Sequence, residues 1–296
     1  MTLDYLQDPD TAGDMLADEL HAGQLTLILG AGVSHGLRLP SWGELVVTLE
    51  TNAGLEPGPS DASADDLMRR MDTVRRTVGD GEAFLDAVHA GLYGPAGHLA
   101  NGSYPEDMVE MRMLIALGAL VMSSRRGSVA DVFTLNFDDV LDWYLHLHGH
   151  RTQIISELPD LHRGDVDVRI HHFHGFLPLM TRYERSRWLL LTRAQLVKRL
   201  AEPTSSPWSA IMGAEFLSKT LLFVGTSMSD MDVDVILSRT ADLVEGSRPL
   251  GFALGVNLTD DRKAALKERG IVPVSLDDYG DIPSFLLDVC QRAADI

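Results

Sequence analysis

The feature that most constrains the fold is an alternation of two patterns along the chain. Short apolar runs, most of them closed by glycine or polar residues, are separated by amphipathic segments with helix-capping residues. Such alternation is typical of an α/β protein with a mostly parallel sheet. We expect seven strands, at residues 25–29, 130–136, 151–155, 166–175, 220–227, 249–257 and 271–276, and a further apolar run follows the fourth at 187–192. The sequence therefore predicts a Rossmann-like sheet flanked by helices.

One stretch interrupts this alternation. Residues 65–124 contain three helical patterns and no strand signal, so we expect a single domain, residues 1–296, with a helical insertion at about residues 55–127. We expect the insertion to pack beside the sheet as a lid or an interface. Its third helix, at 105–124, is apolar on nearly every face. That pattern fits either a buried core helix or a contact surface for another copy or a partner.

Composition argues against several classes of protein. The single cysteine, Cys290, permits neither a disulfide framework nor a four-cysteine zinc site within the chain. The formal net charge of −18 argues against a direct nucleic-acid ligand, although solubility alone also accounts for it. The acidic start of the chain lacks the layout of a secretory signal, and the apolar runs are too short to span a bilayer. We therefore expect a cytoplasmic protein with no membrane partner.

The first predicted strand ends in a glycine turn, Gly-Ala-Gly-Val-Ser, at residues 30–34. A glycine turn between a strand and a helix exposes backbone N–H groups at the positive end of the helix dipole, where a phosphate can bind. No Gly-Lys-Ser/Thr follows, so the turn is not a P-loop. His35 stands where the dinucleotide fingerprint needs its third glycine. Nucleotide binding and a plain structural turn both fit this stretch alone.

Three further predicted strands end in polar residues. The second delivers Asn136 and Asp138, of which Asn136 can orient a water or a sugar hydroxyl, and either can instead cap the following helix. The fifth ends in glycine followed by Thr226 and Ser227, and the sixth ends in Asn257. Because the carboxyl ends of parallel strands meet at one edge of a sheet, these ends together favour a dinucleotide pocket there.

The fourth predicted strand carries three histidines near its end. On an alternating strand, His172 and His174 share one face while His171 points to the other. Two histidines with no nearby cysteine are too few ligands for a metal site. His174 precedes Gly175 at the strand end and is better placed as a base or hydrogen-bond partner. We expect His171 and His172 to be packing or surface residues.

Taken in order, these stretches resemble the sirtuin superfamily. GAGVS, TLNFD, HFHG, FVGTS and GVN are similar to its nucleotide turn, Asn-x-Asp motif, catalytic His-Gly, Gly-Thr-Ser and ribose-side Asn. The resemblance covers most of residues 25–276 outside the helical insertion. LPSWGEL stands where deacylase sirtuins carry Asp-Phe-Arg, and one cysteine cannot supply their zinc ribbon. Pro-x-Trp at residues 40–42, LNFDD and GTSMSDMDV are closer to the branch found in prokaryotic antiviral defence, for which the implied activity is NAD destruction.

The resemblance implies a role for each motif residue. Asn136 would hold the attacking water, and His174 would bind the ribose hydroxyls or take the water's proton, which makes both catalytic. Asp138 would accept a hydrogen bond from the nicotinamide carboxamide. N–H groups of residues 31–34 would bind the pyrophosphate. The full set of implied NAD-binding residues is Gly30, Ala31, Gly32, Val33, Ser34, Phe137, Asp138, Gly225, Thr226, Ser227 and Asn257, the last three on the adenosine half. No metal is implied.

The function implied by this resemblance is an NAD glycohydrolase that depletes NAD in antiviral defence. Two alternatives use the same pocket: a zinc-free NAD-dependent protein deacylase or ADP-ribosyltransferase, and a non-enzymatic nucleotide-sensing subunit. The missing ribbon between His174 and Gly225 disfavours the first, and the presence of both Asn136 and His174 disfavours the second. Because an NAD-destroying effector must be restrained, we expect a homo-oligomer or a separately encoded partner. The resemblance suggests a HerA-like ATPase or an Argonaute-type protein.

Overall fold

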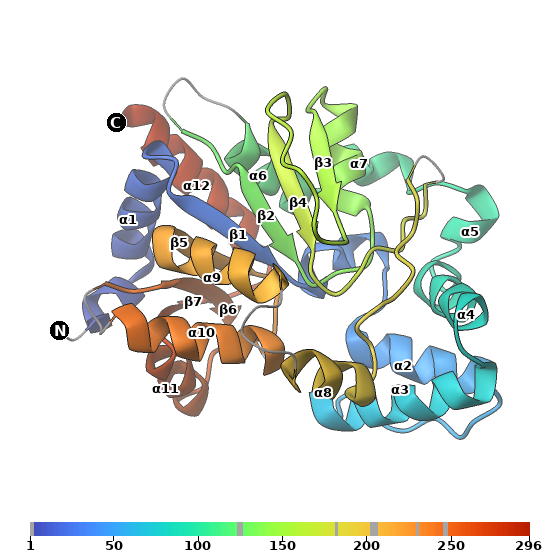
Figure 1. Ribbon diagram of the computed structural model, residues 1–296. Coiled ribbons are helices and arrows are strands. Elements are labelled where there is room, and N and C mark those ends of the chain that lie inside the picture. Colours follow the sequence, from blue (N-terminus) through green and yellow to red (C-terminus); the bar gives the residue numbers. More distant parts are fainter. Residues whose placement is uncertain (1–2, 123–126, 181–182, 202–206, 229–230, 245–247) are drawn as a thin grey trace.

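The computed structural model describes residues 3–122, 127–180, 183–201, 207–228, 231–244 and 248–296. Within them, seven strands form one parallel sheet in the order β3-β4-β2-β1-β5-β6-β7 (Figure 1). The strands are β1 (Leu25–Leu29), β2 (Asp131–Thr134), β3 (Thr152–Ile155), β4 (Val168–His172), β5 (Thr220–Val224), β6 (Gly251–Val256) and β7 (Ile271–Leu276). The predicted α/β class and the predicted parallel sheet are confirmed, and each strand lies inside a segment expected to be one. The further apolar run at 187–192 forms no strand.

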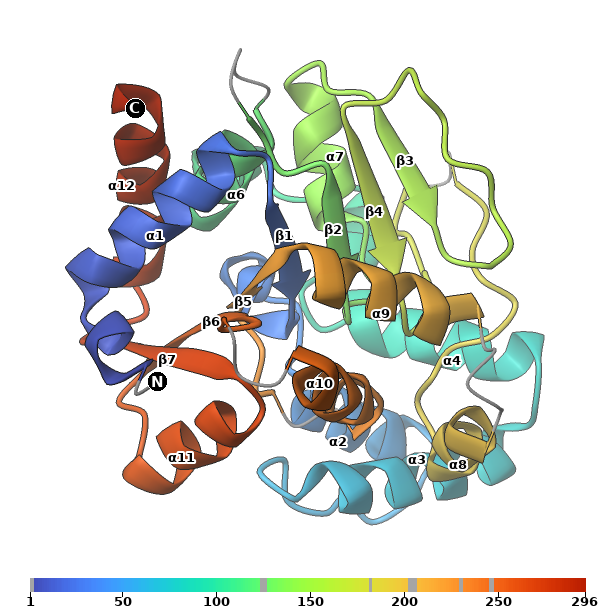
Figure 2. The same ribbon diagram turned by 60° about the vertical axis from the view of Figure 1, so that its left-hand side comes forward.

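The order in which strands are added to the sheet changes side at β1, while all strands stay parallel. Strands β2, β4 and β3 lie on one side of β1, and β5, β6 and β7 lie on the other (Figures 1 and 2). Leu29 pairs with Thr134 of β2 and with Val224 of β5, so these three central strands end at the same level. At such a reversal the connections leave the strand ends in opposite directions and open a crevice at the carboxyl edge, which is where open α/β sheets bind ligands.

Helices cover both faces of the sheet. The helices are α1 (Pro9–His21), α2 (Trp42–Asn52), α3 (Ala64–Val78), α4 (Glu82–Tyr93), α5 (His98–Asn101), α6 (Arg112–Val121), α7 (Val140–Leu147), α8 (Arg193–Ala201), α9 (Pro207–Ser218), α10 (Met231–Val244), α11 (Asp260–Glu268) and α12 (Asp281–Asp295). Because side chains alternate along a strand, Leu27 and Leu29 pack with α1, α6 and α12, whereas Ile28 packs with α9, α10 and α11. The sheet is therefore buried on both sides, which explains why its strands read as continuous apolar runs.

Two of the predicted helix caps are confirmed. The Ser41 hydroxyl accepts from the Glu44 N–H, and the Glu44 carboxylate accepts from the Ser41 N–H at 2.8 Å, forming the capping box of α2. Thr192 and Gln195 make the same reciprocal pair at α8, at 3.0 and 3.3 Å. The cap expected from Ser229 and Asp232 lies outside the described residues and side chains.

The predicted helical segment divides into two parts. Its first helices, α3 and α4, pack against α2 at the carboxyl edge of the sheet. Its last helix, α6, instead packs against α12 and α7 on one face of the sheet, and Gly118 lies so close to α7 that a Cβ there would be 2.8 Å from the Tyr144 ring. The buried face of α6 fits the core-helix interpretation of its apolar sequence.

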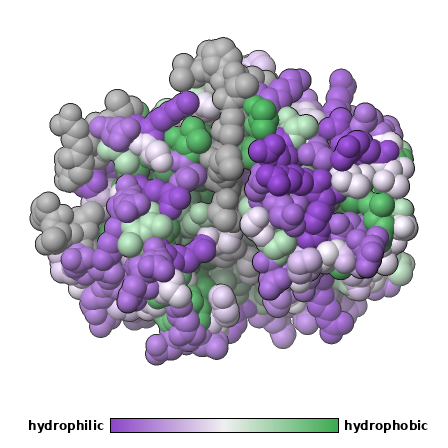
Figure 3. All heavy atoms as spheres, turned by 90° about the horizontal axis from the view of Figure 1, so that it is seen from below, coloured by the Kyte–Doolittle hydropathy of each residue, from purple (hydrophilic) through white to green (hydrophobic). Residues whose placement is uncertain are grey.

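The surface seen from below the view of Figure 1, the side on which α3 and α8 lie, is mainly hydrophilic with small hydrophobic areas (Figure 3). Among the helices of the described residues, none combines the length and the apolar character that crossing a membrane requires.

Candidate functional site

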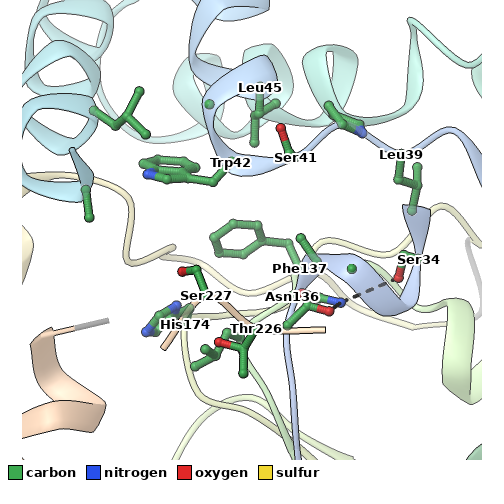
Figure 4. Close-up of a pocket in the computed structure, with 18 of the residues that line it drawn as sticks. Ser34, Leu39, Ser41, Trp42, Leu45, Asn136, Phe137, His174, Thr226 and Ser227 are labelled. Carbon is green, nitrogen blue, oxygen red and sulfur yellow. Dashed lines mark hydrogen bonds between the residues drawn. The ribbon is translucent and has the colours of Figure 1, made fainter. Parts of the chain in front are cut away.

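A cavity of about 460 Å³ lies at the carboxyl ends of β1, β2, β4 and β5, a size typical of small-molecule and cofactor sites. The residues of the strand ends that line it are Gly30, Ala31, Gly32, Ser34, Leu135, Asn136, Phe137, Asp138, His174, Gly225, Thr226 and Ser227 (Figure 4). Of the residues predicted for the site, Val33 and Asn257 do not line this cavity within the described part of the chain. The Val33 side chain is buried in the core, and Asn257 follows β6, one strand farther from β1.

The floor of the cavity consists of two interlocked glycine turns, residues 30–34 after β1 and 225–227 after β5. The Gly30 N–H donates to Val224 O at 3.0 Å, and the Gly32 N–H donates to Gly225 O at 2.8 Å. A Cβ on Gly30 would lie 2.6 Å from Gly225 O, and one on Gly225, which has a φ of +66°, would lie 2.7 Å from the Val33 nitrogen. The glycines are therefore required for the packing of one turn on the other, whether or not a ligand is bound.

Most of the N–H groups that we expected to bind a pyrophosphate are used inside the protein. The turn forms a short 3-10 helix at Ala31–Val33. The N–H of Gly32 donates to the second turn, and those of Val33 and Ser34 donate to carbonyls of their own turn at 3.2 and 3.1 Å. Three of the four predicted N–H donors are thus already engaged. The hydroxyl-bearing residues Thr226 and Ser227 line the same cavity.

Asn136 is held by hydrogen bonds on three of its polar groups. Its backbone N–H donates to Thr134 Oγ1 at 3.1 Å, its backbone oxygen lies 3.0 Å from the ring nitrogen Nδ1 of His172, and its side-chain Nδ2 donates to Gly30 O at 3.1 Å. Nδ2 also lies 3.5 Å from Ser34 Oγ (Figure 4). With Nδ2 engaged in this way, the Oδ1 is the atom of the side chain that can accept a hydrogen bond from a water or ligand.

Asp138 has a double role in the geometry. Its carboxylate accepts at 3.1 Å from the N–H of Val140, the first residue of α7, from one position before the N-cap, which is Asp139. The same carboxylate lines the cavity and accepts from Ser34 Oγ, which lies 3.2 and 3.1 Å from its two oxygens. Burial, together with the negative charge of Asp139, raises the pKa of Asp138 to about 6, against the lowering effect of these hydrogen bonds.

Asp139 was not singled out from the sequence, yet it anchors the site to the helical insertion. Its carboxylate accepts from the Tyr104 hydroxyl and from the backbone N–H groups of Leu179 and Met180 at 3.1 and 3.0 Å. Tyr104 lies in the loop after α5, and the other two donors follow His174 in the chain. Burial raises the pKa of Asp139. The only signal in the sequence was a second aspartate directly after Asp138.

His174 follows β4, which ends two residues before it. The side chain is 5% exposed and lines the cavity, and its backbone oxygen accepts from Leu190 N at 2.7 Å. The next residue, Gly175, has a φ of +103°, and a Cβ there would lie 2.6 Å from Trp188 O. The chain after His174 therefore turns sharply under the 188–190 segment, and this close approach demands a glycine.

The two other histidines are both buried, so their interpretation as packing residues is confirmed and a surface position is excluded. His171 Nε2 lies 3.0 Å from Asp131 Oδ1, and Arg169 pairs with the same carboxylate through two hydrogen bonds. These partners hold the pKa of Asp131 well below its usual range even though burial opposes them. Among the described residues, no group of three or more His, Cys, Asp or Glu could hold a metal ion.

The roof of the cavity is apolar and comes from helices. Trp42 and Leu45 of α2, Leu67 and Met68 of α3, and the loop residue Leu190 line it opposite the strand ends. Figure 4 shows Trp42 on the opposite side of the cavity from Thr226, with the Phe137 ring between them. Helix α3 therefore contributes Leu67 and Met68 to the lining of the cavity. None of these residues was predicted to line the site, because apolar residues at helical spacing do not differ in sequence from core residues.

Comparison with known proteins agrees with this geometry. Residues 130–274 match the family model of the SIR2-like domain. The matched segment begins at β2, ends in β7 and includes Asn136, Asp138, His174 and the turn after β5. No curated protein matches the chain. The resemblance to the sirtuin superfamily is thus confirmed at the level of the domain, and a SIR2-like domain indicates a function related to NAD.

Proposed function

We propose that this chain, which carries a SIR2-like domain, is an NAD glycohydrolase that cleaves NAD to nicotinamide and ADP-ribose and depletes NAD in prokaryotic antiviral defence. The observation that supports it best is the convergence of Asn136 and His174, from different strands, on one cavity above two interlocked glycine turns. A water-orienting amide and a base would then face the same bound dinucleotide.

The chemistry that these residues would perform is a substitution at the ribose carbon that carries nicotinamide. The bond from that carbon to the ring nitrogen breaks, its electron pair neutralises the positive charge of the ring, and nicotinamide leaves as a neutral molecule. Asn136 Oδ1 would hold the attacking water, and His174 would accept the proton that the water loses as the new C–O bond forms. Because the leaving group needs no protonation, the protein's main contribution is position.

The remaining predicted residues would bind the substrate. Asp138 would accept from the nicotinamide carboxamide, with Phe137 beside it. The turn at 30–34 would hold the pyrophosphate with the Thr226 and Ser227 hydroxyls. We place the adenosine half toward Thr226, Ser227 and Asn257, on the β5–β6 side of the sheet. This assignment keeps the nicotinamide end between Asn136 and His174.

The apolar roof supports water, rather than a peptide, as the acceptor. Trp42, Met68 and Leu190 cover the cavity opposite the strand ends, in a region that a deacylase or a protein ADP-ribosyltransferase would have to open to an acceptor chain. The roof would also reduce access of bulk water, which strengthens the electrostatic interactions inside the site.

We further propose that the chain works in the cytoplasm under the control of assembly, either as a homo-oligomer or with a separate partner such as a HerA-like ATPase or an Argonaute-type protein. Helix α6 is packed against α12 and α7, so such contacts would use other surfaces. Light scattering at several protein concentrations, run beside the activity assay, tests this: a strict monomer with full activity would contradict it.

The test of the proposed function is an assay of nicotinamide release from NAD by the purified protein, with and without an acyl-lysine peptide. We expect release without the peptide and equal release in EDTA, because we assign no metal to the site. Release that requires the peptide would favour the deacylase, and NAD binding without release would favour a sensing subunit. Activity lost in EDTA and restored by zinc would contradict the metal-free mechanism.

A further inference from the structure

The side chain of His172 links the two strand ends that carry the proposed catalytic residues. His172 is the last residue of β4 and is 1% exposed. Its Nδ1 lies 3.0 Å from the backbone oxygen of Asn136, which follows β2. A carbonyl oxygen can only accept, so Nδ1 must carry the proton and donate it. The bond therefore runs from a buried histidine directly to the main chain of Asn136.

The rest of the ring is consistent with a neutral histidine in this one tautomer. Within the described residues, the Nε2 atom of His172 has no hydrogen-bond partner. Burial lowers the pKa of His172 to about 3, and the ring packs against Phe176 with centroids 4.3 Å apart. Asp138 and Asp142 line the same small cavity as His172. Because no described residue bonds to Nε2, its protonation would place a charge without a hydrogen-bond partner in a buried site, which is costly. The donor to Asn136 therefore persists across the physiological pH range.

The hydrogen bond from His172 to Asn136 lies in a gap between two backbone hydrogen bonds, next to both proposed catalytic residues. The sheet ladder between the two segments ends with the Phe173 N–H donating to Thr134 O at 3.2 Å, and the next backbone bond runs from Leu177 N to Phe137 O at 2.7 Å. Asn136 and His174 lie between these two bonds. In that interval, the His172 side chain holds the Asn136 peptide beside the strand that leads into His174.

We propose that His172 is a positioning residue for the hydrolysis, one that sets the place of Asn136 relative to His174. The inference rests on the proposed function, because it assumes that Asn136 orients the attacking water. Without this bond, Asn136 keeps only the bonds of its N–H to Thr134 and of its Nδ2 to Gly30, so the position of its Oδ1 is less narrowly fixed. A shift of about 1 Å at a reacting group can lower a rate by about 100-fold.

The neighbouring histidine provides a matched control. His171 is equally buried, pairs with Asp131 at 3.0 Å and stacks on the Phe133 ring with centroids 4.3 Å apart. Its hydrogen bond thus goes to the first residue of β2, at the opposite end of that strand from Asn136. Loss of either ring removes a buried packing residue, so both losses reduce stability. Only the loss of His172 should slow the conversion of bound substrate.

The experiment compares kcat and KM for nicotinamide release among four variants. We expect His172→Phe and His172→Gln to lower kcat by about 100-fold with KM little changed, because the phenyl ring has no donor and the longer amide reaches the Nε2 position instead. His172→Asn should restore most of kcat, because its amide nitrogen can occupy the place of Nδ1. His171→Phe should melt at a lower temperature but keep kcat.

A second measurement is independent of activity. The ¹⁵N shifts of the His172 ring should report a protonated Nδ1 and a bare Nε2 from pH 5 to 8. The proposal is overturned if Nε2 carries the proton, if His172→Asn loses as much kcat as His172→Gln, or if His171→Phe lowers kcat equally. A wild-type protein that releases no nicotinamide refutes the proposed function and the catalytic role of Asn136. In that case the ¹⁵N shifts still test the hydrogen bond from His172 to Asn136, because they show which ring nitrogen carries the proton.

Discussion

The floor and the roof of the cavity are built in different ways. The floor is made of backbone: the turn at 30–34 and the turn at 225–227 interlock through glycines and hydrogen bonds at the ends of central strands. The roof is made of apolar side chains on α2 and α3 and of Leu190 in the loop before α8. Its residues Leu45 and Leu67 belong to the larger core of the sheet, whereas Met68 and Leu190 pack with Leu196 of α8 in a small cluster of their own.

The two constructions suit different tasks, because the floor holds groups in place and the roof can open locally. Close-packed backbone has few alternative arrangements, so the floor can hold reacting groups within narrow limits. A small apolar cluster offers little resistance to local opening, since local stability follows the number of buried contacts. An exposed ion pair between Asp65 of α3 and Arg193 of α8, at 2.7 Å, adds little to it. We therefore expect the part of the roof around Met68 and Leu190 to open more readily than the floor.

The largest expected effect is on the floor, in the variant Asn136→Ala. We expect nicotinamide release to fall by about 10²–10⁴-fold, roughly 3–5 kcal/mol of barrier, because the water loses its hydrogen-bond acceptor. The measurement is kcat at saturating NAD, with thermal melting as the control for folding. A folded variant with a near-normal rate would remove Asn136 from the mechanism.

The next effect concerns the rigidity of the floor. Gly225→Ala should reduce the free energy of unfolding by about 2–5 kcal/mol, because the side chain meets the Val33 nitrogen and φ lies at +66°. Gly213→Ala is the matched control. Gly213 lies within α9, and no neighbouring element among the described residues comes within 4 Å of the place that its methyl group would take, so the same substitution there should be neutral or stabilising. Equal urea midpoints for the two variants would show that the turns are not tightly interlocked.

The third effect is a pH dependence at Asp138. The folded-state pKa of about 6 lies above the ordinary value of 3.8, so protonation favours the folded protein. The stabilisation is fully present below pH 3.8, is lost as the pH rises through 6, and amounts to about 3 kcal/mol. We expect the free energy of unfolding of the wild type, measured relative to that of Asp138→Asn, to increase as the pH is lowered from 7.5 to 4.5. A constant or opposite difference in urea unfolding would show that Asp138 is not destabilised by burial.

The smallest effect is expected at the edge of the roof. Arg193→Gln removes the ion pair with Asp65, whose two side chains are 49% and 35% exposed. We expect a loss of less than about 1 kcal/mol in the free energy of unfolding and no change in kcat. Arg185→Gln, which breaks the pairs of Arg185 with Glu82 and Asp86 away from the cavity, serves as the control and should likewise leave kcat unchanged. If Arg193→Gln costs as much stability as Gly225→Ala, the contrast between floor and roof is wrong.

Sequence reasoning found the parts of the site that carry a polar signal. Asn136, Asp138 and His174 were visible because several polar strand ends at one edge of a parallel sheet together favour a ligand pocket, and the structure brings all three to one cavity. Asp139 and the roof residue Met68 were missed. An aspartate beside another aspartate has the same local pattern whether it binds a ligand or bonds to another segment of the chain. A methionine on an amphipathic helix has the same pattern whether it lines a cavity or packs in the core.

The sequence by itself determined the elements. Burial on both faces makes each strand a continuous apolar run, and capping residues such as Ser41 and Glu44 mark helix starts through bonds between near neighbours in the chain. Tertiary structure decided what depends on distant segments: the strand order, the interlock of Gly30 with Gly225, and the bond from His172 to Asn136. These contacts join residues 195 and 36 positions apart in the sequence, and a local pattern holds no information about such a partner.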